Sequence, residues 1–98
     1  MAFAVVTRVK VRPGSIDELA ALFDETNREL VAGHDDWLGA WFTADRSEHE
    51  VTVIAHWRAA ESYELLRNSP DFQETMAGFA KEFVGPPIVT INEILVQM

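Results

Sequence analysis

The sequence lacks cysteine entirely, so it can form neither a disulfide nor a thiolate metal site, and it has no cysteine nucleophile. Basic residues are scarce too: 8 Lys and Arg against 16 Asp and Glu give a formal net charge of −8. Phosphate binding needs clustered Lys and Arg, so this charge argues against nucleic acid and anionic membranes as partners. Arg8, Lys10 and Arg12 alternate along one segment, which fits the polar face of a half-buried strand better than a phosphate site.

Long apolar runs are also missing, and none approaches the roughly 20 residues that a membrane-spanning helix needs. The residues before Thr7 and Arg8 lack the basic start, long apolar middle and small-residue cleavage site of a signal peptide, so we expect a cytoplasmic protein. Phosphate-binding glycine loops, a nucleophile elbow around serine and a His-Glu-x-x-His zinc helix are absent from the sequence.

The composition that remains is that of an ordinary globular protein, with 48% hydrophobic and 24% charged residues. A length of 98 residues predicts one domain, covering residues 1–98. A chain of this size buries only roughly 60–65% of its unfolded surface, so association with another chain would usefully add to a modest core.

The first half of the chain predicts a strand and then a helix. Apolar residues alternate from Phe3 to Arg12, and Pro13-Gly14 ends the run. Ser15 and Glu18 have the spacing of a reciprocal cap at a helix start. The apolar stripe that follows, which includes Asn27, predicts a helix that stops at a left-handed Gly33.

The second half predicts two strands, two helices and a last strand. The strands span about residues 37–44 and 49–58 and form a hairpin, with Trp37 and Trp41 expected on one face of the first. A short helix covers residues 59–67, and a further helix is capped by Ser69 with Pro70 in its first turn. The final strand covers about residues 88–96. The order β-α-β-β-α-β, with the second helix broken in two, predicts an α+β ferredoxin-like fold with an antiparallel four-stranded sheet.

Both faces of this sheet are expected to be apolar, although helices cover only one of them. Val6, Leu38, Phe42, Ile54, Val89, Ile91 and Leu95 all have apolar partners on the opposite pleat. Burying a few hundred Å² of such surface is worth several kcal/mol at about 25 cal/mol per Å². We therefore expect a homodimer through the open sheet face, with His56 and Glu93 in or near the interface.

Five segments in order give the chain its resemblance to the antibiotic-biosynthesis monooxygenase (ABM) family, and the likeness runs essentially end to end. They are Val11-Arg12-Pro13-Gly14, Trp37-Leu38-Gly39-Ala40, the run from Val51 to Trp57, Ala60-Glu61-Ser62-Tyr63 and Ser69-Pro70-Asp71-Phe72. Trp57 is the most specific single element, and Asp36 departs from the glycine that the family usually has before an aromatic residue. The resemblance implies a dimeric α+β barrel.

Activities in the family include oxygenation of polycyclic phenols and quinols without a cofactor, and oxidative haem breakdown. In the better-known oxygenases the strand tryptophan works with an asparagine four residues earlier and an arginine on the last helix. Trp57 matches the tryptophan, but the asparagine position falls on Val53 and the arginine position on Met76 or Ala77. Haem-degrading members use a histidine on the last helix, where this chain again has Met76.

The candidate site residues each have a structural explanation as well. Trp57, His56 and Tyr63 are the catalytic candidates, but Trp57 also suits core packing and His56, on the opposite face, an interface. Tyr63 could place only its ring inside. The substrate-binding candidates are Thr7, Asn27, Trp41, Val53, Phe72, Met76 and Phe79. Thr7 and Asn27 could equally be locally hydrogen-bonded, and the apolar members could be ordinary core.

Three functions therefore stay open at this point. The first is a cofactor-independent monooxygenase of a small aromatic, phenolic or quinol-like metabolite, which needs no metal and no flavin. The second is a non-enzymatic, ligand-binding or stress-related dimer with the same pocket. The third is a haem-binding member with an atypical ligand. His34, Asp35 and Asp36 could be read as a metal cluster, but adjacent loop residues without a further ligand are weak evidence.

Overall fold

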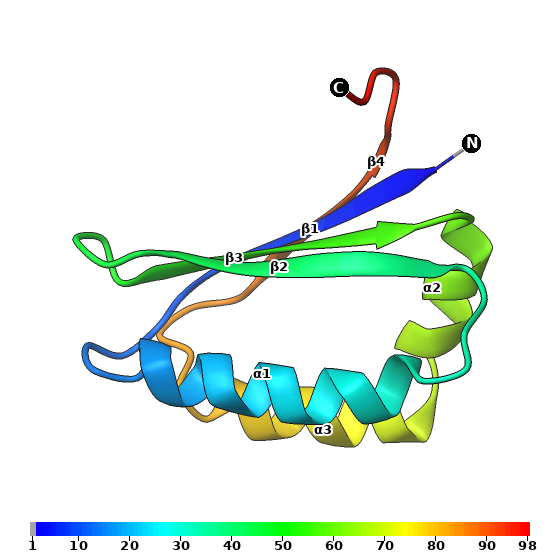
Figure 1. Ribbon diagram of the computed structural model, residues 1–98. Coiled ribbons are helices and arrows are strands. Elements are labelled where there is room, and N and C mark those ends of the chain that lie inside the picture. Colours follow the sequence, from blue (N-terminus) through cyan, green and yellow to red (C-terminus); the bar gives the residue numbers. More distant parts are fainter. Residues whose placement is uncertain (1) are drawn as a thin grey trace.

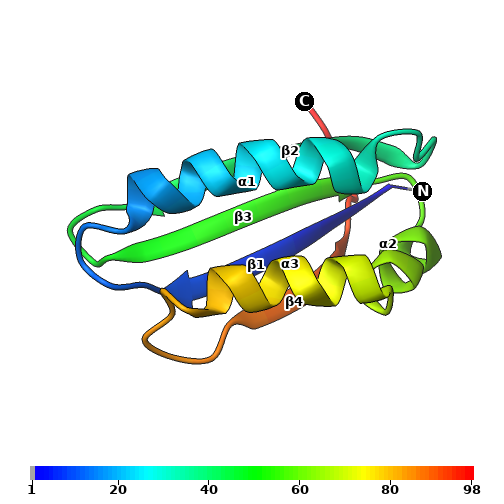
Figure 2. The same cartoon turned by 90° about the horizontal axis from the view of Figure 1, so that it is seen from below.

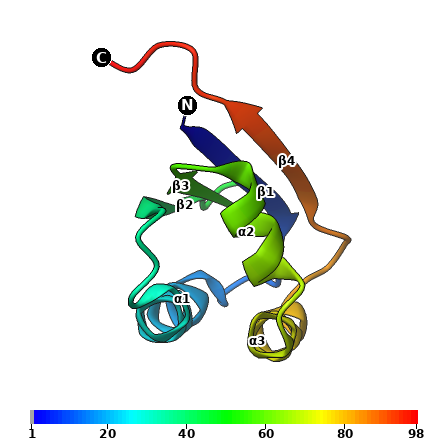
Figure 3. The ribbon, with the colours of Figure 1, turned by 90° about the vertical axis from the view of Figure 1, so that its right-hand side faces the viewer.

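A four-stranded antiparallel sheet, covered on one face by helices, forms the structure (Figure 1), which is a computed structural model describing residues 2–98. The elements in chain order are β1 (Phe3–Lys10), α1 (Ile16–Val31), β2 (Trp37–Asp45), β3 (Glu50–Trp57), α2 (Ala60–Arg67), α3 (Pro70–Ala80) and β4 (Ile88–Glu93). This order confirms the predicted β-α-β-β-α-β arrangement with a broken second helix. Helices α1 and α3 lie side by side below the sheet, and α2 lies beyond the end of β3 (Figures 2 and 3).

The strands lie in the order β2-β3-β1-β4, so β1 and β3 are central. The last strand is shorter than predicted, ending at Glu93 rather than near Val96. Glu93 lies opposite Phe3, the first residue of β1, and the Ile94 N–H donates to the Ala2 carbonyl at 3.0 Å. The strand therefore ends opposite the first residue of its neighbour β1.

A register shift between Trp37 and Gly39 decides which face the side chains of β2 occupy. Trp37 lies opposite Trp57, but Gly39 lies opposite His56, so one extra residue is accommodated near Leu38. Gly39 has φ +145°, a conformation that favours glycine. The prediction that Trp37 and Trp41 share a face is wrong, because this irregularity puts Trp37 on the covered face and Trp41 on the open one.

The helix starts differ in how they are capped. Ser69 caps α3 as predicted, accepting a hydrogen bond from the Phe72 N–H at 3.2 Å, and Pro70 is the first helical residue. The reciprocal cap predicted for Ser15 is wrong, because the Ser15 hydroxyl donates to the Arg12 carbonyl at 2.7 Å instead. Gly33 is left-handed as predicted, with φ +81°.

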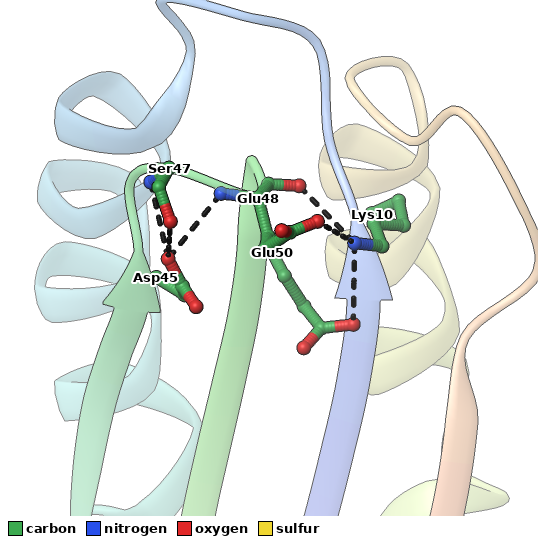
Figure 4. Close-up of polar contacts among 5 residues, drawn as sticks. All are labelled: Lys10, Asp45, Ser47, Glu48 and Glu50. Atoms are coloured by element: carbon green, nitrogen blue, oxygen red, sulfur yellow. Dashed lines mark hydrogen bonds and ion pairs between the residues drawn. The ribbon is translucent and has the colours of Figure 1, made fainter.

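The β2–β3 hairpin ends in a set of polar contacts (Figure 4). The Asp45 Oδ1 accepts from the Ser47 hydroxyl at 2.6 Å and from two backbone N–H groups, and the Ser47 bond above all lowers the pKa of Asp45. Lys10 on β1 donates to the Glu48 carbonyl at 3.2 Å and lies 3.9 Å from the Glu50 carboxylate. The Asp45 contacts stabilise the turn of the hairpin, and the Lys10 contacts join the hairpin to β1.

Two apolar clusters lie between the sheet and the helices. One gathers Val9, Leu19, Val51 and Phe79 near the hairpin end, and the other gathers Val5, Trp57, Tyr63 and Leu66 near α2. At about 25 cal/mol per Å² of buried apolar area, such clusters dominate the stability of a small domain.

The open face of the sheet is less apolar than predicted. Trp41, Ile54 and Val6 are register neighbours across three strands and make one apolar row. Threonines, Arg8, Lys10, His56 and Asn92 surround it, whereas Phe42 and Val89 lie on the covered side. Within residues 2–98, no helix is both long enough and apolar enough to span a membrane.

Candidate functional site

A pocket of about 120 Å³ lies between the sheet and the helices, and its walls include members of both apolar clusters. Side chains of β1 and β3 line it on the sheet side, and α1, α2 and α3 line it on the helix side. Its lining residues include Thr7, Asn27, Trp57, Tyr63, Thr75 and Met76.

The pocket wall is almost entirely aliphatic and aromatic, and no Asp, Glu, Lys, Arg or His of the described chain contributes to it. Its polar groups come from Thr7, Asn27 and Thr75, from the indole of Trp57 and from the phenol of Tyr63. A few polar groups in an apolar hollow are typical of small-molecule sites. The arrangement suits a ligand with an apolar body and one or two oxygen atoms.

Trp57 stands out because it is deeply buried while its donor is unused. Its side chain is 1% exposed, and its ring lies 5.4 Å from the Trp37 ring and 6.1 Å from the Tyr63 ring, measured between centroids. The Nε1–H has no acceptor within residues 2–98. A buried donor without a partner costs about 1–3 kcal/mol. Trp57 therefore lines the pocket with a ring whose buried donor nothing in the described chain satisfies.

Tyr63 is 7% exposed and is held among Trp57, Phe72 and Arg67. Burial raises the pKa of its hydroxyl above the ordinary 10, and the nearby charge of Arg67 opposes this only in part. The phenol thus stays protonated at neutral pH. It can donate a hydrogen bond to an oxygen in the pocket, but it cannot act there as a base.

Asn27 reaches the pocket from α1, one turn after Phe23. Its Nδ2 donates to the Phe23 carbonyl at 3.2 Å, which orients the amide along the helix. This bond uses one of the two donor hydrogens and leaves the amide oxygen as an acceptor. Thr7 lies on β1 between the buried Val5 and Val9, at the centre of the covered sheet face.

Eight of the ten predicted site residues lie around this one pocket: Thr7, Asn27, Val53, Trp57, Tyr63, Phe72, Met76 and Phe79. The structure does not bring Trp41 and His56 there. His56 precedes Trp57 on β3 and so points to the opposite face, where its Nε2 is buried without a partner in the described chain. Trp41 was displaced to that face by the irregularity in β2, and it is 57% exposed.

A groove of about 550 Å³ that the sequence did not reveal adjoins the pocket on the helix side. Leu30, Leu66 and Thr75 line both hollows, so the groove adjoins the pocket at these three side chains. Its other walls are Thr26, Glu29, His34, Leu65, Ser69, Asp71 and Glu74. These are ordinary exposed helix positions, and only their arrangement between α1 and the α2–α3 pair makes them a site.

The described residues form no cluster of metal-ligating side chains. No group of three or more His, Asp or Glu side chains in residues 2–98 is placed to hold a metal ion. Asp36 instead accepts a hydrogen bond from the Ser62 hydroxyl and pairs with Arg58 at 3.6 Å. The Met76 thioether lines the pocket, and no histidine of the described residues does.

Comparison with solved structures shows the same fold at low sequence identity. Rv0793 from Mycobacterium tuberculosis has a TM-score of 0.79 with 21% identity, over 99% of this chain and 98% of that one. A conserved protein from Methanosarcina mazei Go1 gives 0.79 with 16% identity, over 93% and 90%. SnoaB, a cofactor-independent oxygenase from Streptomyces nogalater whose structure is of a mutant, gives 0.81 with 14% identity, over 99% and 96%.

Among proteins with curated functions, none matches this sequence. The profile of the antibiotic biosynthesis monooxygenase family, however, matches residues 2–78, which include both catalytic candidates that line the pocket, Trp57 and Tyr63. With the fold, the pocket and this match in agreement, the chain belongs to the antibiotic biosynthesis monooxygenase family.

Proposed function

We propose that the protein is a cofactor-independent monooxygenase of a small phenol or quinol, which it binds in the pocket between sheet and helices. The observation that carries the proposal is Trp57, which lines an apolar pocket and whose buried Nε1–H has no acceptor within the described chain. A phenolic oxygen in the pocket would satisfy this donor. The fold shared with SnoaB, itself a cofactor-independent oxygenase, is consistent with this chemistry.

The reaction needs only the substrate and molecular oxygen. A phenolate gives one electron to oxygen, and the resulting superoxide couples to a ring carbon to form a peroxide. The peroxide takes up one proton, and loss of the ring proton then breaks the O–O bond and expels hydroxide, leaving a carbonyl on the ring. The departing hydroxide and one proton make water, so one oxygen atom enters the product quinone and the other becomes water.

The protein's contribution would be to stabilise the phenolate. The indole N–H of Trp57 and the phenol of Tyr63 are two of the donors that could do this, and a protonated Tyr63 is the form that burial favours. Donors that act in a pocket without water are stronger than the same donors in solution. They would compensate for the missing asparagine and arginine of the better-known oxygenases, whose positions the resemblance puts at Val53 and at Met76 or Ala77.

Oxygen uptake with a panel of phenols, hydroxynaphthalenes and anthrones tests the proposal. We expect Trp57→Phe to lower the rate at least tenfold, because it removes the donor and keeps an aromatic ring. Trp41→Phe is the matched control, since it makes the same change on the open face. Absence of uptake by the native protein, or equal rates for native protein and Trp57→Phe, would contradict the proposal.

One observation favours the second candidate, a binding protein without enzymatic activity. No carboxylate or imidazole of the described residues lines the pocket, so nothing there removes the phenol's proton. Such a protein would bind the same phenols, with a change in the Trp57 indole signal, and would consume no oxygen. Measuring binding and oxygen uptake on the same sample separates the two candidates.

We also propose that two copies associate through the open sheet face. The apolar row of Trp41, Ile54 and Val6 lies there, with Ile88 next to Arg8 at its edge. Trp41 and Ile88 are 57% and 64% exposed, which is unusual for side chains of this size in a chain that stays alone in water.

A further inference from the structure

We infer that the ligand of this pocket is a one-ring phenol without an acidic group, which enters between α1 and the α2–α3 pair. The inference rests on the proposed function for the identity of the reacting group. It adds the size and the charge of the molecule, and both come from the geometry of the pocket and the adjoining groove.

The size limit comes from the volume of the inner pocket. Apolar cavities of about 150 Å³ in other proteins bind benzene. The pocket here measures about 120 Å³ and is closed on the sheet side by the buried Val9, Val51 and Trp57. A single ring fits this space, whereas a second or third fused ring would have to displace packed side chains.

The charge limit comes from the adjoining groove. Three carboxylates line it: Glu29 from α1, and Asp71 and Glu74 from α3. No Lys or Arg of the described chain lines it, and His34 is its one imidazole. All three acidic residues are exposed, so they repel an approaching anion through water within a Debye length of about 8 Å.

A chain attached to the ring would therefore extend into the groove while the ring lies inside. Leu30, Leu66 and Thr75, which line both hollows, mark the point where ring and chain would meet. The groove, at about 550 Å³, leaves ample room for a polar substituent. A carboxylate there would face three like charges, and an ammonium or hydroxyl group would not.

Three phenols of similar length test the charge limit: tyrosol, tyramine and phloretate, in which two methylene groups join the ring to a hydroxyl, an ammonium and a carboxylate. Binding is measured by calorimetry and by the shift of the Trp57 indole N–H signal, assigned with Trp57→Phe. We expect phloretate to bind about tenfold more weakly than tyrosol at low salt, and high salt to reduce the gap. Tyramine should bind at least as well as tyrosol.

The double variant Glu29→Gln/Glu74→Gln should reduce the discrimination against phloretate to about threefold. Glu25→Gln/Glu61→Gln is the matched control, because it removes equal charge from the same chain at exposed positions outside the groove. Equal affinities for the three phenols in the native protein, or equal effects of the two double variants, would overturn the charge limit.

Anthrone tests the size limit, and we expect at least tenfold weaker binding than for tyrosol. Tighter binding of anthrone would overturn it, as would failure of all three one-ring phenols to bind. Because these readouts are affinities, they are independent of oxygen consumption. The predicted order of affinities without oxygen uptake would support the ligand class and refute the monooxygenase. Oxygen uptake, with anthrone or phloretate as the tightest-binding ligand, would support the monooxygenase and refute the ligand class.

Discussion

The Ser62 hydroxyl on α2 donates a hydrogen bond to the carboxylate of Asp36, in the loop that leads into β2. The backbone of the same Asp36 accepts from the Arg58 N–H at 2.7 Å. Asp36 thus joins three segments: its own loop, the end of β3 that carries Trp57, and the helix that carries Tyr63. The residue that departs from the usual family glycine has a positioning role next to the pocket.

We expect Ser62→Ala to lower the free energy of unfolding by about 1.5–3 kcal/mol, the usual contribution of a hydrogen bond to a charged partner. Urea denaturation followed by far-ultraviolet circular dichroism measures it. Asp36→Asn should also lower the free energy of unfolding. Asp35→Asn is its control, because the Asp35 carboxylate has no hydrogen bond or ion pair within residues 2–98. Equal losses for the two aspartates would refute this role for Asp36.

Loss of the α3 cap should also be measurable. Ser69→Ala removes the acceptor of the Phe72 N–H and should cost about 1 kcal/mol of stability. Ser69→Asp supplies another acceptor at the same place and should retain most of the stability that the cap contributes. A Ser69→Asp protein as unstable as Ser69→Ala would show that the bond contributes nothing. Thermal unfolding of the three proteins gives the comparison.

The ion pair between Asp17 and Arg46 ties the start of α1 to the β2–β3 hairpin, with a nitrogen–oxygen distance of 2.7 Å. The hydrogen bond from Arg46, and then its charge, lower the pKa of Asp17 below 3.8. A lowered pKa stabilises the fold above pH 3.8, and the contribution is lost as the pH falls through the native value. Arg46→Gln should raise the Asp17 pKa towards 3.8 in an NMR titration. Arg28→Gln, which disrupts only the Asp24 pair, should leave it unchanged.

Tyr63 is the one tyrosine in the sequence, so its titration can be followed directly by ultraviolet absorbance. Because burial raises its pKa, we expect ionisation in the native protein above pH 10 and ionisation near 10 in denaturant. A raised pKa leaves stability intact below about pH 10 and reduces it as the pH rises through the native value. Native ionisation at or below that of the denatured chain would contradict the buried position.

The dimer proposal predicts that a charge on the open face separates the subunits. Trp41→Lys places an ammonium in the apolar row beside Ile54 and should shift light-scattering mass at micromolar concentration from two chains to one. Leu65→Lys is the control, since Leu65 is exposed on α2, away from the sheet. A native protein that is already monomeric at this concentration would refute the proposal.

Sequence patterns predicted the order of the elements because each carries a local signal. Alternation in β1, the Ser69-Pro70 start of α3 and the left-handed Gly33 all depend on near neighbours in the chain. The end of β4 was not predictable in this way, since it depends on where Phe3 begins the neighbouring strand. The alternative bond of Ser15 to Arg12 depends on the geometry of the turn before α1.

The candidate site was predicted to a similar extent and for a similar reason. Trp57, Thr7 and Asn27 interrupt or close apolar patterns, and such interruptions can be seen in a sequence. The groove could not be seen, because Glu29 and Glu74 are ordinary exposed helix residues until α1 and α3 are placed side by side. Trp41 was misplaced because a single extra residue in β2 reverses the alternation after it.

The nearly uncharged wall of the pocket has a consequence for how this scaffold can diversify. Apolar substitutions at Val53, Phe72, Met76 and Phe79 would change the shape of the pocket. They would leave neither an unpaired charge nor a metal ion without a ligand. Volume-conserving swaps of apolar side chains usually cost less than about 1.5 kcal/mol. New ligand shapes are therefore accessible by small, individually tolerable steps, and a combinatorial library at these four positions is a practical route to altered selectivity.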